Sequence, residues 1–334
     1  MSPGPGRGAA ITGWGSALPP RVVTNQDVTT LFDTSDEWIV ERSGIHRRHH
    51  ASGPFVAEAD QPPAHPGDGV GSTATLAIEA GREALAQAGV TGADVGLLVL
   101  CTTSPDQAVP ATSSAVSAAL GIAGGAMDLN AACAGFTYGL VTAASLVASG
   151  IDRVLLVGAE TLTRVTNFAD RSNAFLFGDG AGAVVLEAVP GPGCLLGWDL
   201  GVDGTLVALL YADHGGPGMA MRGQEVFRRA VRVTVDSAEL SLQRAKVGVD
   251  EVALFVPHQA NSRIMDAVAD RLGLPRERIA SVIHETGNTS SASIPLALVD
   301  AARAGRLADG DLVLLAGFGA GMTWASAVWR WGTQ

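Results

Sequence analysis

The sequence predicts an α/β protein in which two related halves stack as five layers, α/β/α/β/α. Nearly continuous apolar runs such as "VGLLVL" and "VALFVP" are typical of strands buried on both faces of a sheet, and helix-like segments closed by glycine alternate with them. The same order of strand, polar loop, helix and strand occurs twice, which indicates an internal duplication. We therefore expect mixed or parallel sheets covered by helices on both faces.

The repeat sets the expected halves. "ADVGLLVLCTTSP" has the plan of "VDEVALFVPHQAN", and the segment from "AACAGF" to "LLVGAE" parallels the segment from "GNTSSASIP" to "LLAGFG". A glycine-rich bend appears in each copy, "FGDGAG" in the first and "FGAGMT" in the second. We expect an N-terminal half at residues 1–189 and a C-terminal half at residues 190–334, meeting near Ala188 to Gly193.

Composition narrows the class of protein. The chain has 334 residues, of which 47% are hydrophobic and 42 are glycine, which suits a tightly packed protein with room for two units. Its net charge of -11 argues against a nucleic-acid partner, because phosphate binding needs a basic surface. The three cysteines are an odd number, and the chain opens without a signal-peptide pattern. We expect a cytoplasmic protein without disulfides.

Three stretches stand out by composition. The uncharged stretch from Asn130 to Ile151 is long enough to span a bilayer, but its polar and small residues favour a buried core helix, so no membrane is expected as partner. Residues 51–71 form a Pro/Gly-rich loop, and residues 201–223 are irregular. Such loops are lids or binding loops, or else simply mobile, and both interpretations remain open.

Cys133 is the first candidate for chemistry. In "DLNAACAGF" small residues give way to helix periodicity, which places the thiol at a helix N-terminus. Exposed amides and the helix dipole there stabilise a thiolate, so we expect a thiol pKa lowered from about 8.5 into a range of roughly 3.5 to 7.5. The alternative is a buried structural cysteine.

The C-terminal half supplies two further candidates. His258 follows "VALFVP" directly, at the carboxyl edge of a predicted strand, and Asn288 lies in "GNTSSASIP", the duplicate of the turn that holds Cys133. The simpler interpretations are a core histidine with satisfied hydrogen bonds and a helix or turn cap. If the halves pack about a pseudo-twofold axis, the three loops converge and bring together one nucleophile and two neutral hydrogen-bond donors.

Taken together, the motifs resemble those of β-ketoacyl-acyl carrier protein synthase III of the thiolase superfamily. The resemblance runs in the family's order from Thr34 to Trp324. It implies a duplicated thiolase-like fold and a condensing acyltransferase of fatty acid or polyketide biosynthesis. The motifs that carry it are "TSDEWIVERSGIHRRH", "DLNAACAGF", "DRSNAFLFGDGAGAVVL", "VPHQANSRI", "GNTSSASIP" and "GFGAGMTW".

The resemblance also implies a mechanism. Cys133 would attack an acyl-CoA thioester, and malonyl-acyl carrier protein would then bind. His258 and Asn288 would donate hydrogen bonds to the malonyl thioester oxygen, so that loss of carbon dioxide leaves an enolate that attacks the acyl-enzyme. The backbone amides of Cys133 and Ala320 would form the oxyanion hole. The substrates would be a CoA thioester and the phosphopantetheine of the carrier, with no tightly bound cofactor.

Five further residues match the family's CoA motifs. Trp38 would stack on the adenine with Arg171 on its other face, and Arg42 would meet phosphate with Thr34 nearby. Asn261 would face the pantetheine arm. For Trp38 and Arg42 the alternative is a helix-face anchor and a surface ion pair.

The resemblance further predicts a carrier-docking patch and an acyl pocket. Arg228, Arg263 and Arg271 fall where the family keeps basic residues for the acidic carrier, although Asp270 puts an acid among them. Val109 lies where relatives send a side chain across a homodimer to floor the acyl tunnel. Because Val is smaller than the bulky residue often found there, we expect a starter larger than acetyl.

No metal site is predicted. The run "HRRHH", His46 to His50, has no nearby cysteine and only scattered acids, so we interpret it as solvated basic surface. Asp179 in "FGDGAG" resembles a phosphate loop weakly, and a tight turn between strands is preferred.

Three rival functions remain. A cysteine thioesterase or amidase would use water as acceptor, and a related acyltransferase would transfer the acyl group to a hydroxyl or amine. A partner subunit without activity would need none of the three candidates. Asn288, which the resemblance assigns to decarboxylation, favours condensation.

Overall fold

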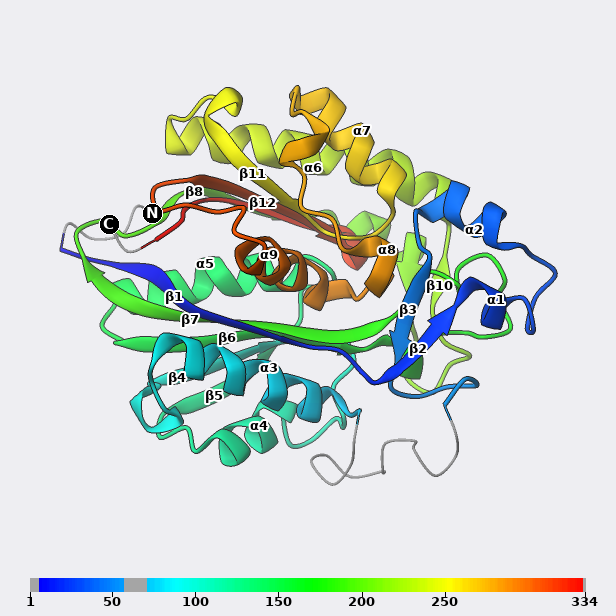
Figure 1. The fold of residues 1–334 in the computed structure, drawn as a ribbon, viewed down its shortest axis with the longest axis horizontal. Coiled ribbons are helices and arrows are strands. Elements are labelled where there is room, and N and C mark those ends of the chain that lie inside the picture. Colours follow the sequence, from blue (N-terminus) through cyan, green and yellow to red (C-terminus); the bar gives the residue numbers. More distant parts are fainter. Residues whose placement is uncertain (1–5, 57–70, 333–334) are drawn as a thin grey trace.

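The computed structural model describes residues 6–56 and 71–332, and these residues form two sheets and the helices that cover them (Figure 1). The strands are β1 (Arg7–Ala17), β2 (Arg21–Thr24), β3 (Arg47–His50), β4 (Leu97–Cys101), β5 (Gly125–Leu129), β6 (Arg153–Thr161), β7 (Asp179–Pro190), β8 (Leu195–Val202), β9 (Leu210–Tyr211), β10 (Ala220–Met221), β11 (Val252–Pro257), β12 (Leu312–Gly319) and β13 (Thr323–Arg330). The α-helices are α1 (Asn25–Val28), α2 (Asp36–Ser43), α3 (Thr73–Ala88), α4 (Thr112–Leu120), α5 (Gly135–Ala148), α6 (Gly223–Ala245), α7 (Ser262–Leu272), α8 (Ile283–Thr286) and α9 (Ser293–Arg303).

The two main sheets share one strand order, as the duplication predicts. The first runs β1-β7-β6-β4-β5 and the second β8-β13-β12-β11. In both, the first three strands are antiparallel neighbours and the next pair is parallel. The second sheet has no strand in the place of β5 among the described residues, where a single bridge joins Ile279 to Phe255. The expectation of a duplicated α/β fold is therefore confirmed.

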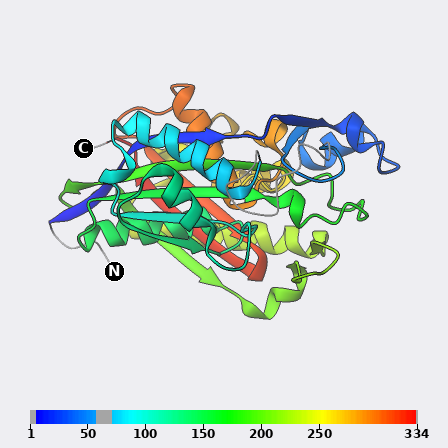
Figure 2. The ribbon, with the colours of Figure 1, turned by 90° about the horizontal axis from the view of Figure 1, so that it is seen from below.

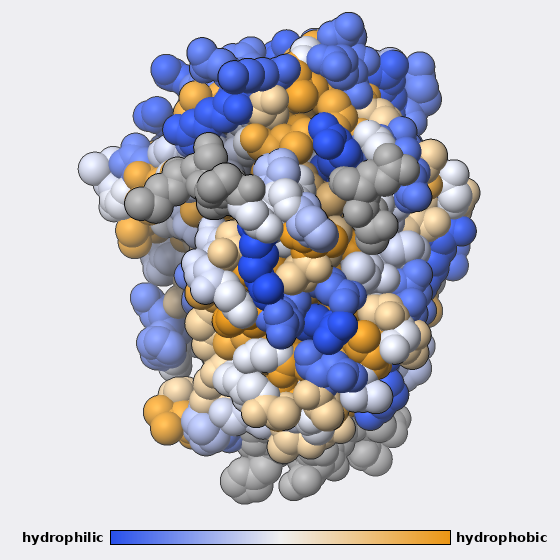
Figure 3. All heavy atoms as spheres, turned by 90° about the vertical axis from the view of Figure 1, so that its left-hand side faces the viewer, coloured by the Kyte–Doolittle hydropathy of each residue, from blue (hydrophilic) through white to orange (hydrophobic). Residues whose placement is uncertain are grey.

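Helices separate and cover the sheets in five layers (Figure 1). α5 and α9 lie between the sheets, α3 and α4 cover the outer face of the first, and α6 and α7 cover the outer face of the second. Figure 2 shows α3 crossing the strands of the first sheet. Figure 3 shows hydrophilic side chains gathered at the top of the molecule, over the α6 and α7 layer. The apolar side chains pack in one cluster between the sheets and one beneath each outer layer.

Local sequence explains where the helices begin and end. The Ser72 side chain accepts from the Thr75 N–H to cap α3, and Gly89 ends that helix in the left-handed conformation. Asn261 caps α7 in the same way by accepting from the Arg263 N–H. α5 forms within the uncharged stretch noted above and is largely buried. Within the described residues, no helix is both long and apolar enough to cross a membrane.

One interpretation of the sequence is wrong for two of its residues. His46 and Arg47 are solvated as expected, but β3 alternates and turns Arg48 and His50 inward, where both are buried. Arg48 donates to the carbonyl oxygens of Val23 and Phe175. Of the predicted loops, residues 57–70 lie outside the described part, and residues 201–223 contain a 3₁₀ turn and the short β9–β10 pair.

Candidate active site

Cys133 lies in a tight turn between β5 and α5. The Asn130 Oδ1 atom accepts from the Ala132 N–H at 3.1 Å, and Ala132 takes a left-handed φ of 49°. Cys133 follows, Ala134 is the N-cap and α5 begins at Gly135. The predicted position of the thiol at a helix start is therefore confirmed.

The expected low pKa of this thiol is not found. Burial first, and then the negative charge of Glu160, raise the pKa of Cys133 to about 12, although the neighbouring Ser290 hydroxyl lowers it. Withdrawal of the thiolate from water outweighs the groups that would stabilise it. The resting nucleophile is a neutral thiol, so it must be deprotonated as the substrate reacts.

A titration follows from this pKa. Because the thiol is protonated throughout the neutral range, the rate of Cys133 alkylation by iodoacetamide will rise with pH and will not level off below about pH 9. The measurement is peptide mapping of Cys133 after timed alkylation between pH 6 and pH 10, with free glutathione as the reference thiol. A plateau below pH 8 would contradict the raised pKa and restore the helix-stabilised thiolate.

His258 directly follows β11 and is buried. Its backbone N–H donates to the Ala316 carbonyl, and its Nδ1 atom lies 2.6 Å from the Ser293 Oγ atom. Ser293 Oγ also accepts from the Gln259 N–H. Among the described residues, the acceptor within reach of the Ser293 hydroxyl proton is Nδ1 of His258. This leaves the ring proton on Nε2. Burial lowers the pKa of His258 to about 3, so the ring is a neutral donor at neutral pH.

Asn288 is held by the N-terminal half. Its backbone N–H donates to the Leu176 carbonyl, and its own carbonyl accepts from the Gly178 N–H. The Oδ1 atom accepts from the Ser290 N–H at 2.9 Å. The amide oxygen is thereby engaged, and the Nδ2 hydrogens remain available as donors toward the cavity.

One cavity of about 1370 Å³ contains these groups. Cys133, His258, Asn288 and Ala320 all line it, so residues from both halves meet in one space as predicted. The lining also includes Thr103, Ser104, Gln107 and Ala108 after β4, residues 210–218, Trp38 and the first turns of α6 and α7. The cavity can therefore take a long thioester substrate whose reacting carbon meets the thiol.

Gly319 opens the space beside the Cys133 amide. A Cβ atom at residue 319 would lie 2.5 Å from the Cys133 nitrogen and 2.8 Å from the Ala132 Cβ, so only glycine allows β12 to end there. The 3₁₀ turn Ala320–Met322 follows. The Thr323 Oγ1 atom ties this turn to the cysteine turn by donating to the carbonyl of Ala131 or of Ala320. The arrangement is suited to an oxyanion hole made of backbone amides.

Four of the five predicted CoA residues line the cavity, and Thr34 does not. The Arg42 guanidinium lies 5.4 Å from the centre of the Trp38 ring, and Trp38 packs edge-on against Phe175. Asn261 caps α7, and its Nδ2 donates to the Arg42 carbonyl, which joins α2 to α7.

The remaining predicted residues are divided between the cavity and the surface. Arg228 and Arg263 line the cavity mouth, whereas Arg271 lies outside it on α7. Val109 does not line the cavity and is 85% exposed, although Gln107 and Ala108 beside it do line it.

Sequence reasoning missed four residues of the site. Ser293 orients His258, Gly319 leaves the Cys133 amide open, and Ser290 and Glu160 influence the thiol. Only Gly319 carries a sequence signal, as one glycine of the "GFGAG" bend. The described residues include no group of three His, Cys, Asp or Glu side chains placed to hold a metal ion.

Comparisons with known proteins agree with this geometry. Residues 127–204 match the family model described as 3-oxoacyl-[acyl-carrier-protein (ACP)] synthase III, and residues 242–331 match the model of its C-terminal part. A β-ketoacyl-[acyl-carrier-protein] synthase III of Erythrobacter litoralis is 46% identical over 97% of this chain and 99% of the relative. The chain belongs to the β-ketoacyl-[acyl-carrier-protein] synthase III family. It is a condensing acyltransferase.

Solved structures of this synthase family extend the comparison. The 3-oxoacyl-[acyl-carrier-protein] synthase III from Aquifex aeolicus is 38% identical, with a TM-score of 0.89 over 97% of this chain and 100% of that chain. The priming β-ketosynthase of the R1128 polyketide pathway is 36% identical, with a TM-score of 0.86 over 98% of this chain and 97% of that chain. The family resemblance stated from the motifs and the thiolase-like fold are both confirmed.

Proposed function

We propose that the protein starts acyl chains by condensing a CoA-bound starter with malonyl-acyl carrier protein. The observation that carries this is the meeting in one cavity of a cysteine at a helix start, two neutral hydrogen-bond donors and an open backbone amide. That set provides one nucleophile, a site for an enolate oxygen and a site for a tetrahedral oxyanion.

In the first step Cys133 takes the acyl group from the CoA thioester. The Cys133 sulfur forms a bond to the thioester carbon, the bond from that carbon to the CoA sulfur breaks, and the thiol proton leaves with CoA. The amides of Cys133 and Ala320 stabilise the oxygen of the tetrahedral intermediate. Since the resting thiol is neutral, no thiolate is exposed before the substrate arrives.

In the second step the malonyl thioester loses carbon dioxide. Its carbonyl oxygen accepts from Nε2 of His258 and Nδ2 of Asn288, so the electrons of the broken carbon–carbon bond are held as an enolate. The enolate carbon attacks the acyl group on Cys133, the carbon–sulfur bond breaks, and the thiolate recovers a proton from solvent. The neutral state of His258 suits this role, because a neutral donor does not give up its proton in the neutral range.

The cavity mouth supports the proposed binding of CoA and of the carrier. Trp38, Arg42, Arg171 and Asn261 line this cavity, which supports the first three as contacts of the adenine and its phosphates and Asn261 as a contact of the pantetheine. Arg228 and Arg263 at the same mouth, with Arg271 further along α7, are proposed to meet the acidic carrier. The same opening would then serve both thioesters, one after the other, and no tightly bound cofactor is needed.

A second copy of the chain is proposed to complete the pocket that holds the acyl group. β5 is an edge strand whose Gly125 and Ala126 are exposed, and such an edge is suited to pairing with another strand. Asp128 of β5 accepts from the N–H groups of Thr112 and Ser113, which places the loop of Val109 beside this edge. Val109 would thus cross to the partner and floor its pocket, leaving room for a starter larger than acetyl.

The rival functions lack such support. A thioesterase or an acyltransferase to a hydroxyl or amine does not need the paired donors of His258 and Asn288. We place the enzyme in the cytoplasm, where its three free cysteines would stay reduced.

The test is acylation followed by discharge. The protein is incubated with acetyl-CoA and with longer and branched acyl-CoAs, the intact mass is recorded, the adduct is mapped, and malonyl-acyl carrier protein is added. We expect an adduct on Cys133 that forms in higher yield with the longer starters. Malonyl-acyl carrier protein should then discharge it as β-ketoacyl carrier with release of carbon dioxide. Discharge by water or by an amine without carbon dioxide would reject condensation. Equal or better turnover with acetyl-CoA would reject the larger starter.

A further inference from the structure

The turn that holds Asn288 is a second copy of the turn that holds Cys133. Asn288 Oδ1 accepts from the Ser290 N–H as Asn130 Oδ1 accepts from the Ala132 N–H. Ser290 has a φ of 47° where Ala132 has 49°. In both turns the next helix begins three residues later, with α9 starting at Ser293 and α5 at Gly135. This matching places Ser291 in the position of Cys133.

The two turns differ in what faces them. In the sequence repeat "LLAGFG" and "LLVGAE" are equivalent, so Gly319 corresponds to Glu160. Gly319 leaves the backbone N–H of Cys133 open. Glu160 fills the corresponding space, and its Oε1 atom accepts from the Ser291 N–H at 3.3 Å and lies 2.7 Å from the Ser291 Oγ. A carboxylate therefore takes the place that a substrate oxyanion takes beside Cys133.

Glu160 is fully buried and binds the loop after β4 as well. Its Oε2 atom accepts from the N–H groups of Thr103 and Ser104 and from three hydroxyls, those of Thr102, Thr103 and Ser104. The shortest of these contacts is 2.6 Å, from Ser104 Oγ. A buried carboxylate that accepts from so many donors is strongly anchored, and removing it leaves those donors unsatisfied.

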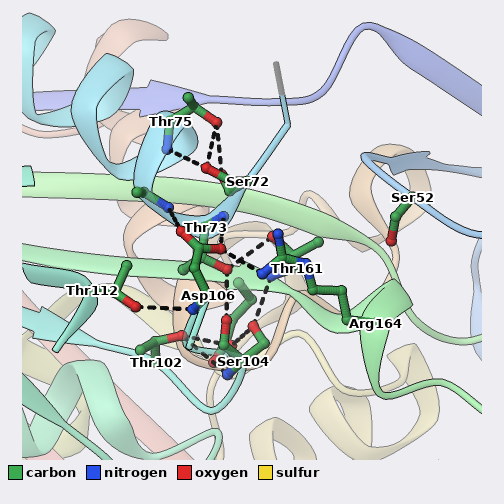
Figure 4. Close-up of polar contacts among 12 residues, drawn as sticks. Ser52, Ser72, Thr73, Thr75, Thr102, Ser104, Asp106, Thr112, Thr161 and Arg164 are labelled. Carbon is green, nitrogen blue, oxygen red and sulfur yellow. Dashed lines mark hydrogen bonds and ion pairs between the residues drawn. The ribbon is translucent and has the colours of Figure 1, made fainter. Parts of the chain in front are cut away.

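Figure 4 shows Ser104 at the lower end of a cluster of polar side chains, next to Thr102 and joined to Thr161 by a hydrogen bond. Its Oγ accepts from the Thr161 N–H, so its own proton goes to Glu160. Ser104 and Thr103 line the same cavity as Cys133. Glu160 thus connects the cavity wall in one half to the turn that orients Asn288 in the other.

We propose that Glu160 is a positioning residue of the condensation step, whose carboxylate holds the turn of Asn288 and so fixes the amide donors that face the malonyl thioester. The proposal rests on the proposed function. The path is short, because Ser291, which Glu160 binds, directly follows Ser290, whose N–H holds the Asn288 side-chain oxygen. A shift of this turn would misplace the Nδ2 donors while leaving the Cys133 turn intact.

The charge of Glu160 gives a second, independent signal. It raises the pKa of Cys133, so a neutral residue at 160 will lower that pKa. A residue with only a packing role would not change the titration of the thiol. The pH dependence of Cys133 alkylation therefore reports on the charge, and the condensation rate reports on the position of Asn288.

The experiment compares Glu160→Gln, Glu160→Asp and Ser291→Ala with wild type in two separated steps. The steps are acylation of Cys133 by acyl-CoA and release of carbon dioxide from malonyl-acyl carrier protein by the acylated enzyme. For Glu160→Gln we expect the rate of the second step to fall about 100-fold, while the rate of the first step stays within a few-fold of wild type. The pH profile of Cys133 alkylation should move to lower pH. Glu160→Asp should keep the wild-type alkylation profile while slowing the second step. Asn288→Ala is the reference for complete loss of the amide donors.

Ser291→Ala keeps the carboxylate and loses the hydroxyl contacts to Glu160 and to the Cys101 carbonyl, so the second step should fall about fivefold. Its effect should be smaller when it is added to Glu160→Gln, since the two variants share the contact between Ser291 and residue 160. If Glu160→Gln does not fold, Ser291→Ala and Glu160→Asp carry the test. Equal losses in both steps, or an unchanged second step, would overturn the proposal. Absence of any acyl adduct in wild type would instead reject the proposed function.

Discussion

Replacing Cys133 by alanine will abolish the acyl adduct and lower condensation by at least about 10³-fold. The reason is that no other cysteine can take its place. Cys101 and Cys194 are buried outside the cavity, whereas the Cys133 turn faces it beside the oxyanion position. Serine at position 133 should not restore activity, because its hydroxyl is harder still to deprotonate in the same buried site.

The measurement is intact mass after incubation with the acyl-CoA that labels wild type best, followed by the condensation rate. Cys194→Ala is the matched control, since its Sγ donates to the Gly332 carbonyl far from the cavity, and it should acquire the adduct as wild type does. An adduct of unchanged yield on Cys133→Ala would show that another residue is the nucleophile.

Replacing Gly319 by alanine will lower both half-reactions by about 10²- to 10³-fold. The added methyl group would lie 2.5 Å from the Cys133 nitrogen, closer than non-bonded atoms approach, so either β12 or the cysteine turn must move. Both movements separate the amides of Cys133 and Ala320. Because tetrahedral intermediates form in acylation and again in condensation, both steps should be affected.

The control is Gly204→Ala, where a Cβ atom would meet nothing within 4 Å. This variant should keep both rates within a factor of two, whereas Gly319→Ala should lose them and still fold, as judged by circular dichroism. Loss of condensation alone, with normal acylation, would show that Gly319 does not serve a shared oxyanion hole.

The sequence predicts the fold well because the fold depends on patterns within short segments. Apolar runs, glycine stops and the repeated order are each visible in a few residues, and the duplicated strand order follows from them. The missing counterpart of β5 could not be predicted, since Ile279 lies in a segment as apolar as many strands. Whether such a segment pairs depends on the packing around it.

The sequence identified the residues of the candidate site but did not predict their burial or their pKa values. The position of Cys133 before a helix follows from local periodicity. Its raised pKa depends on burial and on the charge of the β6 residue Glu160, which is remote in sequence, and periodicity reveals neither. The inward turn of Arg48 and His50 was missed for the same reason.

The backbone pairing of Asn288 with residues 176–178 also bears on how the enzyme acquires activity during folding. Ser291 and Glu160 are 131 residues apart in sequence, and Thr323 reaches the Ala131 carbonyl across 192 residues. Contacts of such long sequence separation form late, because the closure of large loops must come first. Helices and hairpins in each half can therefore be complete while the chain still lacks a working centre, and catalytic competence is among the last properties that the folding chain gains.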